Sequence, residues 1–204
     1  MFRQHIYNES YALVDPEQDG TRAKRESGPL IAFACQSDAA RLLDYGGGEG
    51  HLACILREYG FQAESWDPMR DGTAPPEPGT FDIVTAHEVL EHTPDPLGTC
   101  RQALSFPRPG GIFLFSTLPL DDLPPRATDH WYIAPRNGHI SIHTNQSLRL
   151  LFDRLGWRVR QYGPHHHMAF TAETRRRTVM TRGARMLDPA VSSPPTAARS
   201  RSPD

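Results

Sequence analysis

The sequence has few cysteines and no long apolar segment. Its three cysteines, Cys35, Cys54 and Cys100, are odd in number and widely spaced, so neighbours cannot form a disulfide framework or a C-x-x-C metal or redox pair. No apolar run approaches the roughly 20 residues of a membrane-spanning helix, and the first residues lack the apolar core of a signal peptide. These absences predict a cytoplasmic protein with no membrane partner.

A dominant charge is also absent. The chain carries 22 Lys and Arg against 24 Asp and Glu, a formal net charge of −2 at pH 7. This balance gives no electrostatic reason to expect nucleic acid as a partner and leaves a small molecule as the expected ligand. With 204 residues, 38% of them hydrophobic, the chain is long enough for one domain with a sizeable core, in a monomer or a homodimer.

Changes in composition divide the chain into three parts. Residues 1–27 are polar with scattered aromatics and are expected to form an N-terminal arm or lid. Residues 28–172 carry the periodic apolar patterns of a folded domain, which begins with a helix opened by Pro29. Residues 173–204 are rich in Arg, Ser and Pro, so they cannot bury enough apolar surface to order themselves, and we expect a disordered tail.

Strand-like and helix-like patterns alternate through the central part. The expected strands lie near residues 42–43, 62–66, 81–86, 112–117, 157–162 and 167–171. Helices are expected near residues 28–37, 51–59, 95–106 and 144–155, with caps at Asp95 and Thr144 or Asn145. This alternation predicts an α/β fold with a mostly parallel sheet covered on both faces.

A glycine-rich segment follows the first expected strand. Glycine permits positive φ angles and close approach of a ligand to the backbone, and free N–H groups at the start of the next helix can meet a polar ligand. The spacing is Asp44-x-Gly46-x-Gly48-x-Gly50. A dinucleotide-binding G-x-G-x-x-G fingerprint would need its third glycine at position 51, where the chain has His51.

With this motif, the sequence resembles the class I S-adenosylmethionine-dependent methyltransferases of the small-molecule type. The resemblance covers about residues 28–172 and implies a Rossmann-like three-layer sandwich. Its mostly parallel sheet would have seven strands, or six, with the last strand antiparallel. The loop from Asp44 through Gly46 and Gly48 to Gly50 would wrap the amino-acid part of S-adenosylmethionine. Asp67, which ends the second strand beside Pro68, would bind the ribose hydroxyls.

A second block, from Phe81 to Pro96, resembles the family's fourth-strand motif and its E-x-L-E-H run. By this resemblance His87 and Glu88 line the methionine and sulfonium side of the cofactor. In one helical turn, Glu88, Glu91 and His92 would share a face. Some ubiquinone-pathway O-methyltransferases hold a divalent cation with a similar run. Packing and helix N-terminal charge are the favoured interpretation here, so no metal site is predicted.

The sequence departs from the family between the second and third expected strands. Only the thirteen residues 68–80 separate Asp67 from Phe81, and four of them are proline. A helix plus a further strand hardly fits there, so the usual adenine-contacting acid is missing, and Asp71 is the only weak substitute.

The acceptor is expected to bind at the long connection of residues 118–143. Methyl transfer to a hydroxyl requires loss of a proton, which a neutral histidine can accept. The candidate bases are His87, His139 and His143, with His130 a further candidate, and Trp131 and Tyr132 are candidate lid residues. His165, His166 and His167 are expected to be structural, because consecutive strand residues point to opposite faces.

These patterns predict transfer of the S-adenosylmethionine methyl group to a small-molecule acceptor, with O-methylation favoured. The first alternative is a regulatory protein that binds the cofactor without catalysis, because of the missing strand region. Carbon or nitrogen methylation is a further alternative. A nucleic-acid methyltransferase is disfavoured because the chain has neither an N/D-P-P-Y/F motif nor a folded basic patch.

Overall fold

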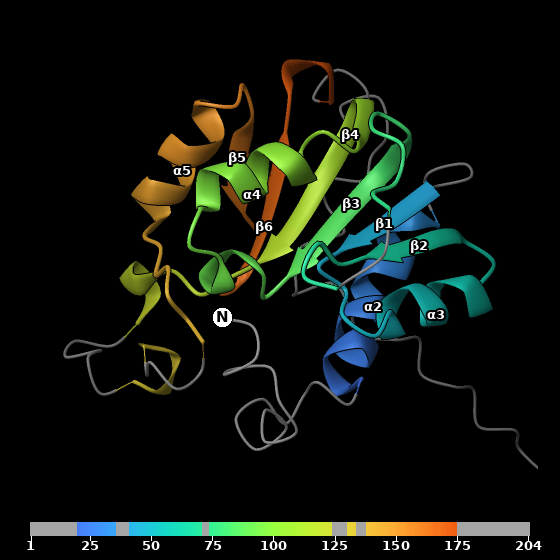
Figure 1. The fold of residues 1–204 in the computed structure, drawn as a ribbon, viewed down its shortest axis with the longest axis horizontal. Coiled ribbons are helices and arrows are strands. Elements are labelled where there is room, and N and C mark those ends of the chain that lie inside the picture. Colours follow the sequence, from blue (N-terminus) through green and yellow to red (C-terminus); the bar gives the residue numbers. More distant parts are fainter. Residues whose placement is uncertain (1–19, 36–40, 71–73, 124–129, 134–137, 175–204) are drawn as a thin grey trace, which may run out of the picture.

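A six-stranded sheet forms the centre of the molecule (Figure 1). The computed structural model describes residues 20–35, 41–70, 74–123, 130–133 and 138–174. The strands are β1 (Arg41–Tyr45), β2 (Gln62–Trp66), β3 (Phe81–His87), β4 (Pro107–Ser116), β5 (Arg158–Gln161) and β6 (His166–Phe170). They lie in the order β2-β1-β3-β4-β6-β5, with β2, β1, β3 and β4 parallel. The last strand, β6, is antiparallel to both of its neighbours, as predicted.

The prediction allowed seven strands or six, and the sheet has six. Between β2 and β3 the described residues form neither a helix nor a strand, so β2 lies at the edge of the sheet. This agrees with the short proline-rich connection. Asp71, the weak substitute for the adenine-contacting acid, lies outside the described residues.

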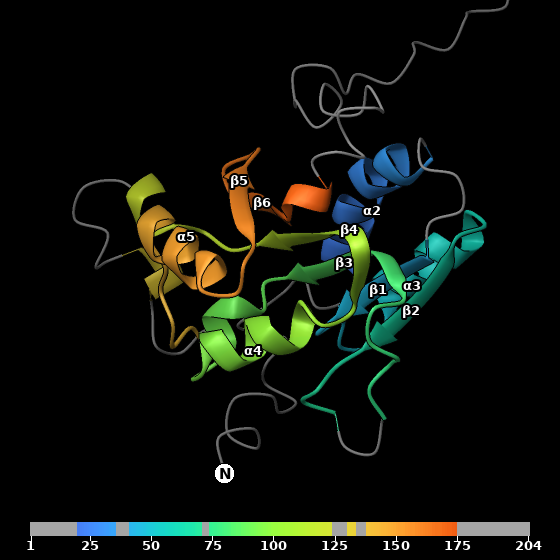
Figure 2. The ribbon, with the colours of Figure 1, turned by 90° about the horizontal axis from the view of Figure 1, so that it is seen from above.

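Helices cover both faces of the sheet (Figure 2). On one face, α2 (Thr21–Ala34) and α3 (His51–Glu58) pack through Leu30, Leu52 and Leu56 against the apolar side chains of the strands. On the other face, α4 (Pro96–Ala103) and α5 (Asn145–Asp153) pack through Cys100, Leu148 and Phe152. The three-layer Rossmann-like architecture is therefore confirmed. None of the helices among the described residues is long and apolar enough to cross a membrane.

The expected helix caps explain where α4 and α5 begin. The Asp95 carboxylate accepts a hydrogen bond from the Gly98 backbone N–H at 2.9 Å, and Pro96 occupies the first helical position. Thr144 and Ser147 form a capping box in which each side chain bonds the backbone of the other residue. Local sequence alone thus determines both helix starts.

The first helix begins earlier than predicted. The sequence placed its start at Pro29 and assigned residues 21–27 to an arm, but α2 starts at Thr21 and contains Pro29 in its interior. Glu26 is buried, and its carboxylate bonds the imidazole of His166 at 2.8 Å. This contact joins α2 to β6, so tertiary packing extends the helix across the proline. Residues 21–27, predicted as part of the arm, therefore belong to α2.

Candidate active site

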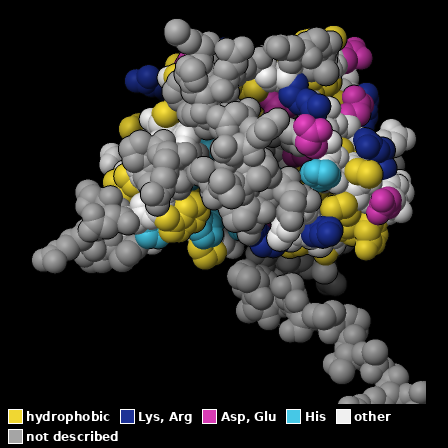
Figure 3. All heavy atoms as spheres, turned by 60° about the horizontal axis from the view of Figure 1, so that its bottom comes forward, with side chains coloured by type: hydrophobic (Ala, Val, Ile, Leu, Met, Phe, Trp, Pro, Cys, Tyr) yellow, Lys and Arg dark blue, Asp and Glu magenta, His cyan; other side chains and the backbone are white. Residues whose placement is uncertain are grey.

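The glycine loop connects β1 to α3 at the carboxyl edge of the sheet, which is turned toward the viewer in Figure 3. Gly46, Gly48 and Gly50 all have positive φ angles, of 73°, 54° and 79°. A Cβ atom on Gly46 would lie 2.7 Å from Val89, the residue after Glu88, whereas one on Gly48 would meet open space. The loop therefore packs against the segment after β3 and leaves room for a ligand above Gly48.

Asp44 lies beneath this loop at the end of β1. It is 6% exposed, and its carboxylate accepts a hydrogen bond from Thr85 Oγ1 at 2.9 Å. Burial, reinforced by the nearby Asp67, raises the pKa of Asp44 to about 7. The adjacent Ser65 hydroxyl is buried and has no hydrogen-bond partner among the described residues. Both groups can take a polar ligand, and a cationic one would restore the charge of Asp44.

Asp67 and Pro68 follow β2, whose last residue, Trp66, pairs with Tyr45 at the end of β1. The Asp67 carboxylate accepts the backbone N–H of Met69 at 2.7 Å. Arg70 reaches back to the glycine loop, where its guanidinium donates to the Gly48 carbonyl at 2.5 Å. The structure thus brings Asp44, the glycines, Asp67 and Pro68 to one edge of the sheet.

Two glutamates follow β3, on the other side of the loop. Glu88 has a φ of 52°, an uncommon backbone conformation for a residue other than glycine. Its carboxylate accepts the Ser116 hydroxyl at 3.0 Å. Glu91 belongs to the single turn η3 (Leu90–His92) and is fully buried. Strain and burial at the same point are typical of functional sites.

The two carboxyl groups differ in protonation. Burial, together with the neighbouring Glu88 charge, raises the pKa of Glu91 well above its usual range. Although burial opposes it, hydrogen bonding to Glu91 and the nearby Arg22 charge hold the pKa of Glu88 below its usual value. Glu91 is therefore the neutral acid and Glu88 the carboxylate of the pair.

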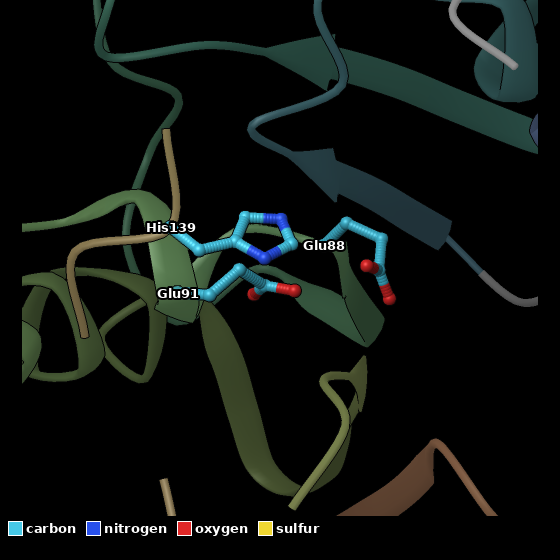
Figure 4. A group of neighbouring side chains, drawn as sticks. All are labelled: Glu88, Glu91 and His139. Atoms are coloured by element: carbon cyan, nitrogen blue, oxygen red, sulfur yellow. The ribbon is translucent and has the colours of Figure 1, made fainter. Parts of the chain in front are cut away.

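The histidine beside this pair is His139 rather than the predicted His92 (Figure 4). Each of Glu88, Glu91 and His139 has one ligand-type atom within 4.8 Å of the other two. The His92 ring instead bonds the Gly138 carbonyl at 3.2 Å and lies edge-on to the His139 ring. The expected helical face does not form, because Glu88 leaves helical geometry and η3 is only three residues long.

These three residues are also the donor types of a cation site. Magnesium or calcium would need its ligands to converge at about 2.0 to 2.6 Å from one point. One Glu91 oxygen already accepts the Tyr132 hydroxyl at 2.7 Å, and the Glu88 carboxylate accepts Ser116. One oxygen of each acid thus has a partner, while the second Glu91 oxygen, Oε2, is buried without a hydrogen bond among the described residues. Our prediction remains that the site works without a metal.

The other candidate histidines occupy different surroundings. His143 is 7% exposed, and burial lowers its pKa. His87, at the end of β3, has a buried Nδ1 atom with no hydrogen-bond partner among the described residues, 3.8 Å from the Glu26 carboxylate. His130 accepts the backbone N–H of Tyr132 at 3.3 Å. Of the candidates, His139 is the one grouped with both glutamates.

Helix α2 adds two charged residues that the sequence did not indicate. Glu26 lies between His87 and His166. Burial raises its pKa, but the hydrogen bond to His166 and the charges of the two histidines together outweigh burial and lower the pKa of Glu26 to about 2. The Arg22 charge acts on Glu88 and on His87. Because these contacts join segments far apart in the chain, no local sequence signal could have revealed them.

Residues 20–162 match the family described as a methyltransferase domain. The chain belongs to this methyltransferase family. The match spans most of the chain and includes the glycine loop, Asp67, Glu88 and His139. The predicted methyltransferase family and its Rossmann-like fold are confirmed.

Curated relatives share shorter stretches with this methyltransferase. A ubiquinone biosynthesis O-methyltransferase of Xanthomonas campestris is 33% identical over 112 residues, which are 43% of this chain and 47% of the relative. One of Ralstonia nicotianae is 39% identical over 61 residues, 30% of this chain and 26% of the relative. The chain thus spans less than half the length of these relatives.

Solved structures share the fold over most of this chain. A methyltransferase of Thermotoga maritima, described as a possible histamine N-methyltransferase, has a TM-score of 0.57 at 15% identity, covering 82% of this chain and 98% of its own. The mitomycin 7-O-methyltransferase structure has a TM-score of 0.60 at 19% identity, covering 83% and 60%. Magnesium protoporphyrin IX methyltransferase of Synechocystis, with bound S-adenosylhomocysteine, has a TM-score of 0.55 at 14% identity, covering 84% and 93%.

The residues at the carboxyl edge fit S-adenosylmethionine. The open space above Gly48 and the unpartnered Ser65 hydroxyl lie where a ligand's amino-acid end can meet the backbone. The raised pKa of Asp44 marks a buried carboxyl group that a bound ammonium would stabilise in its ionised form. The Asp67 carboxylate is a suitable acceptor for two vicinal hydroxyls.

Proposed function

We propose that this protein transfers the methyl group of S-adenosylmethionine to a hydroxyl group of a small-molecule acceptor, with His139 as the general base. The observation that carries the proposal is the grouping of His139 with Glu88 and Glu91, beside the glycine loop. In open α/β sheets, ligands bind at the carboxyl edge where the strand order reverses. Here that point lies between β1 and β3, which are followed by the loop and by Glu88.

The hydrogen bonds of His139 suit it to accept a proton. Its Nδ1 atom lies 2.6 Å from the Tyr132 backbone carbonyl, which can only accept a hydrogen bond. Nδ1 therefore carries the proton of the neutral ring, and the lone pair that can accept a proton is on Nε2. The negative charge of Glu88 favours the imidazolium that forms when Nε2 takes the acceptor's proton.

The bound cofactor supplies an electrophilic methyl group on a sulfonium. The protein's own part is to hold the acceptor in line with that methyl group and to remove the hydroxyl proton as the oxygen–carbon bond forms. The proton goes to His139, and the electron pair of the broken carbon–sulfur bond stays on sulfur. Ubiquinone biosynthesis O-methyltransferases among the relatives support a hydroxyl acceptor over a carbon or nitrogen acceptor.

The test combines binding with turnover. Calorimetry should show micromolar affinity for S-adenosylmethionine and none for NAD, and Asp67→Ala should weaken cofactor binding by about 1.5–3 kcal/mol. With methyl-labelled cofactor and a panel of small hydroxyl, amine and carbon acceptors, label should pass to hydroxyl compounds.

His139→Ala should lower this turnover by roughly 10²- to 10⁴-fold while cofactor affinity stays unchanged. His165→Ala is the matched control, because its side chain is exposed. Full turnover by His139→Ala would refute the assignment of the base. Tight cofactor binding with no turnover on any acceptor would favour a regulatory protein.

A further inference from the structure

Tyr132 ties the acceptor connection to the sheet. It lies in the single turn η6 (Trp131–Ile133) and is 1% exposed. Its hydroxyl donates to Glu91 Oε1 at 2.7 Å, accepts the backbone N–H of Leu118 at 3.0 Å and lies 2.9 Å from Thr117 Oγ1. One donor and two acceptor positions are all that a phenol has, so its hydrogen-bonding capacity is fully used.

The same residue holds His139 by its backbone. The Tyr132 carbonyl accepts the His139 Nδ1–H at 2.6 Å, and the centres of the two rings are 4.3 Å apart. The Tyr132 hydroxyl thus ties η6 to Glu91 after β3 and to Thr117 and Leu118 after β4. The Tyr132 carbonyl holds the imidazole of His139. Any shift of the turn would move the carbonyl away from Nδ1.

We infer that Tyr132 is a positioning residue, which sets the tautomer of His139 and its location beside Glu88 and Glu91. The role of His139 rests on the proposed function, but the positioning by Tyr132 rests on geometry alone. The hydroxyl bonds Glu91 directly, and the carbonyl bonds His139, so one residue holds two members of the group in register. Since hydrogen-bond partners select the histidine tautomer, this contact determines which nitrogen is available to a substrate.

A purely structural role for Tyr132 makes a different prediction. If the ring only fills space, a phenylalanine of nearly equal size would preserve the site. Tyr132→Phe removes one oxygen atom and leaves Glu91, Leu118 and Thr117 each without this partner in a buried place. The turn then loses its polar contacts with the sheet while its ring packing remains.

The experiment measures the ring ¹⁵N shifts of His139 in the full chain with ¹⁵N-labelled histidine, at pH 8 and without substrate. His139→Ala identifies the resonances. In the native protein Nδ1 should have the shift of a protonated nitrogen. In Tyr132→Phe it should move toward the value of an unprotonated nitrogen, as the two tautomers mix. Unchanged shifts in Tyr132→Phe would overturn the inference.

Two further variants keep the test decisive. Tyr45→Phe is the matched control, because Tyr45 is equally buried and its hydroxyl donates to Gln102 at 2.9 Å; it should leave the His139 shifts unchanged. Thr117→Val removes one partner of the phenol while keeping the side-chain shape. It should cause a smaller shift in the same direction if Tyr132→Phe proves too unstable to measure, and no shift would count against the inference.

The outcome separates this inference from the proposed function. If the tautomer changes in Tyr132→Phe but His139→Ala retains full turnover, Tyr132 positions a histidine that is not the base. If the tautomer is unchanged while His139→Ala is inactive, the base is correct and the positioning role of Tyr132 is refuted.

Discussion

Replacement of Glu26 by glutamine tests whether helix α2 is held on the domain by a buried charge. Each tenfold change in an acid dissociation constant corresponds to about 1.4 kcal/mol. A folded-state pKa of about 2, against an ordinary value of 4.5, therefore stabilises the folded protein by about 3 kcal/mol at pH values just above 4.5, as long as the histidine partner is protonated. Since the pKa is lowered on folding, the stabilisation is present above the unfolded value and is lost as the pH falls through about 2.

Urea unfolding, followed by circular dichroism at pH 5 and pH 3.5, measures this contribution. Glu26→Gln should lower the free energy of unfolding by about 2 to 3 kcal/mol at pH 5, and the difference from the native protein should shrink by about 1 kcal/mol at pH 3.5. Glu58→Gln, on the exposed end of α3, is the control and should change little. A Glu26→Gln protein as stable as the native one at both pH values would refute the reasoning.

Gly47→Ala should reduce S-adenosylmethionine affinity by roughly tenfold or more by calorimetry, because its Cβ would overlap the side-chain oxygens of Asp44 and Ser65. Gly28→Ala, in α2 and outside the glycine loop, is the control and should keep the affinity. Chelation with EDTA should leave turnover unchanged; activity that disappears with chelator and returns with magnesium would establish a metal site. Truncation after Thr174 should keep the melting temperature within about two degrees, because the residues beyond it lack apolar periodicity; a large drop would mean that they pack on the domain.

Features determined by neighbouring residues could be predicted from the sequence. The glycine loop requires positive φ angles at alternate positions, and only glycine adopts them without strain. The caps at Asp95 and Thr144 depend on residues within three positions. The strand bounds follow from short apolar runs between turns, and β2 agrees with the prediction at both ends.

Features determined by distant residues could not be predicted. Pro29 fits the first position of a helix, but the contact between Glu26 and His166 joins positions 140 residues apart and carries α2 past the proline. The start of the predicted tail illustrates the same point. Thr174 was assigned to it, yet its buried hydroxyl donates to the Gly111 carbonyl at 2.8 Å, so the truncation is placed after this residue.

Backbone geometry explains why His139, and not the predicted His92, lies beside Glu88 and Glu91. The expected shared face of Glu88, Glu91 and His92 assumed one regular helical turn. A positive φ at Glu88 breaks that regularity, and the His92 ring instead bonds Gly138, the residue just before His139. The connection after β4 thereby brings its own histidine to the glutamates, which a pattern within residues 88–92 cannot reveal.

The short connection after β2 affects which contacts hold the loop that follows Asp67. Among the described strands β2 lies at the edge of the sheet. Its exposed Glu64 pairs with Arg41 of β1 at 2.8 Å, and charged side chains on an edge strand discourage pairing with another chain. Among the described residues no strand on that side supports the loop that follows Asp67. Arg70 supplies that support from within the loop, because its bond to the Gly48 carbonyl ties this loop directly to the glycine loop.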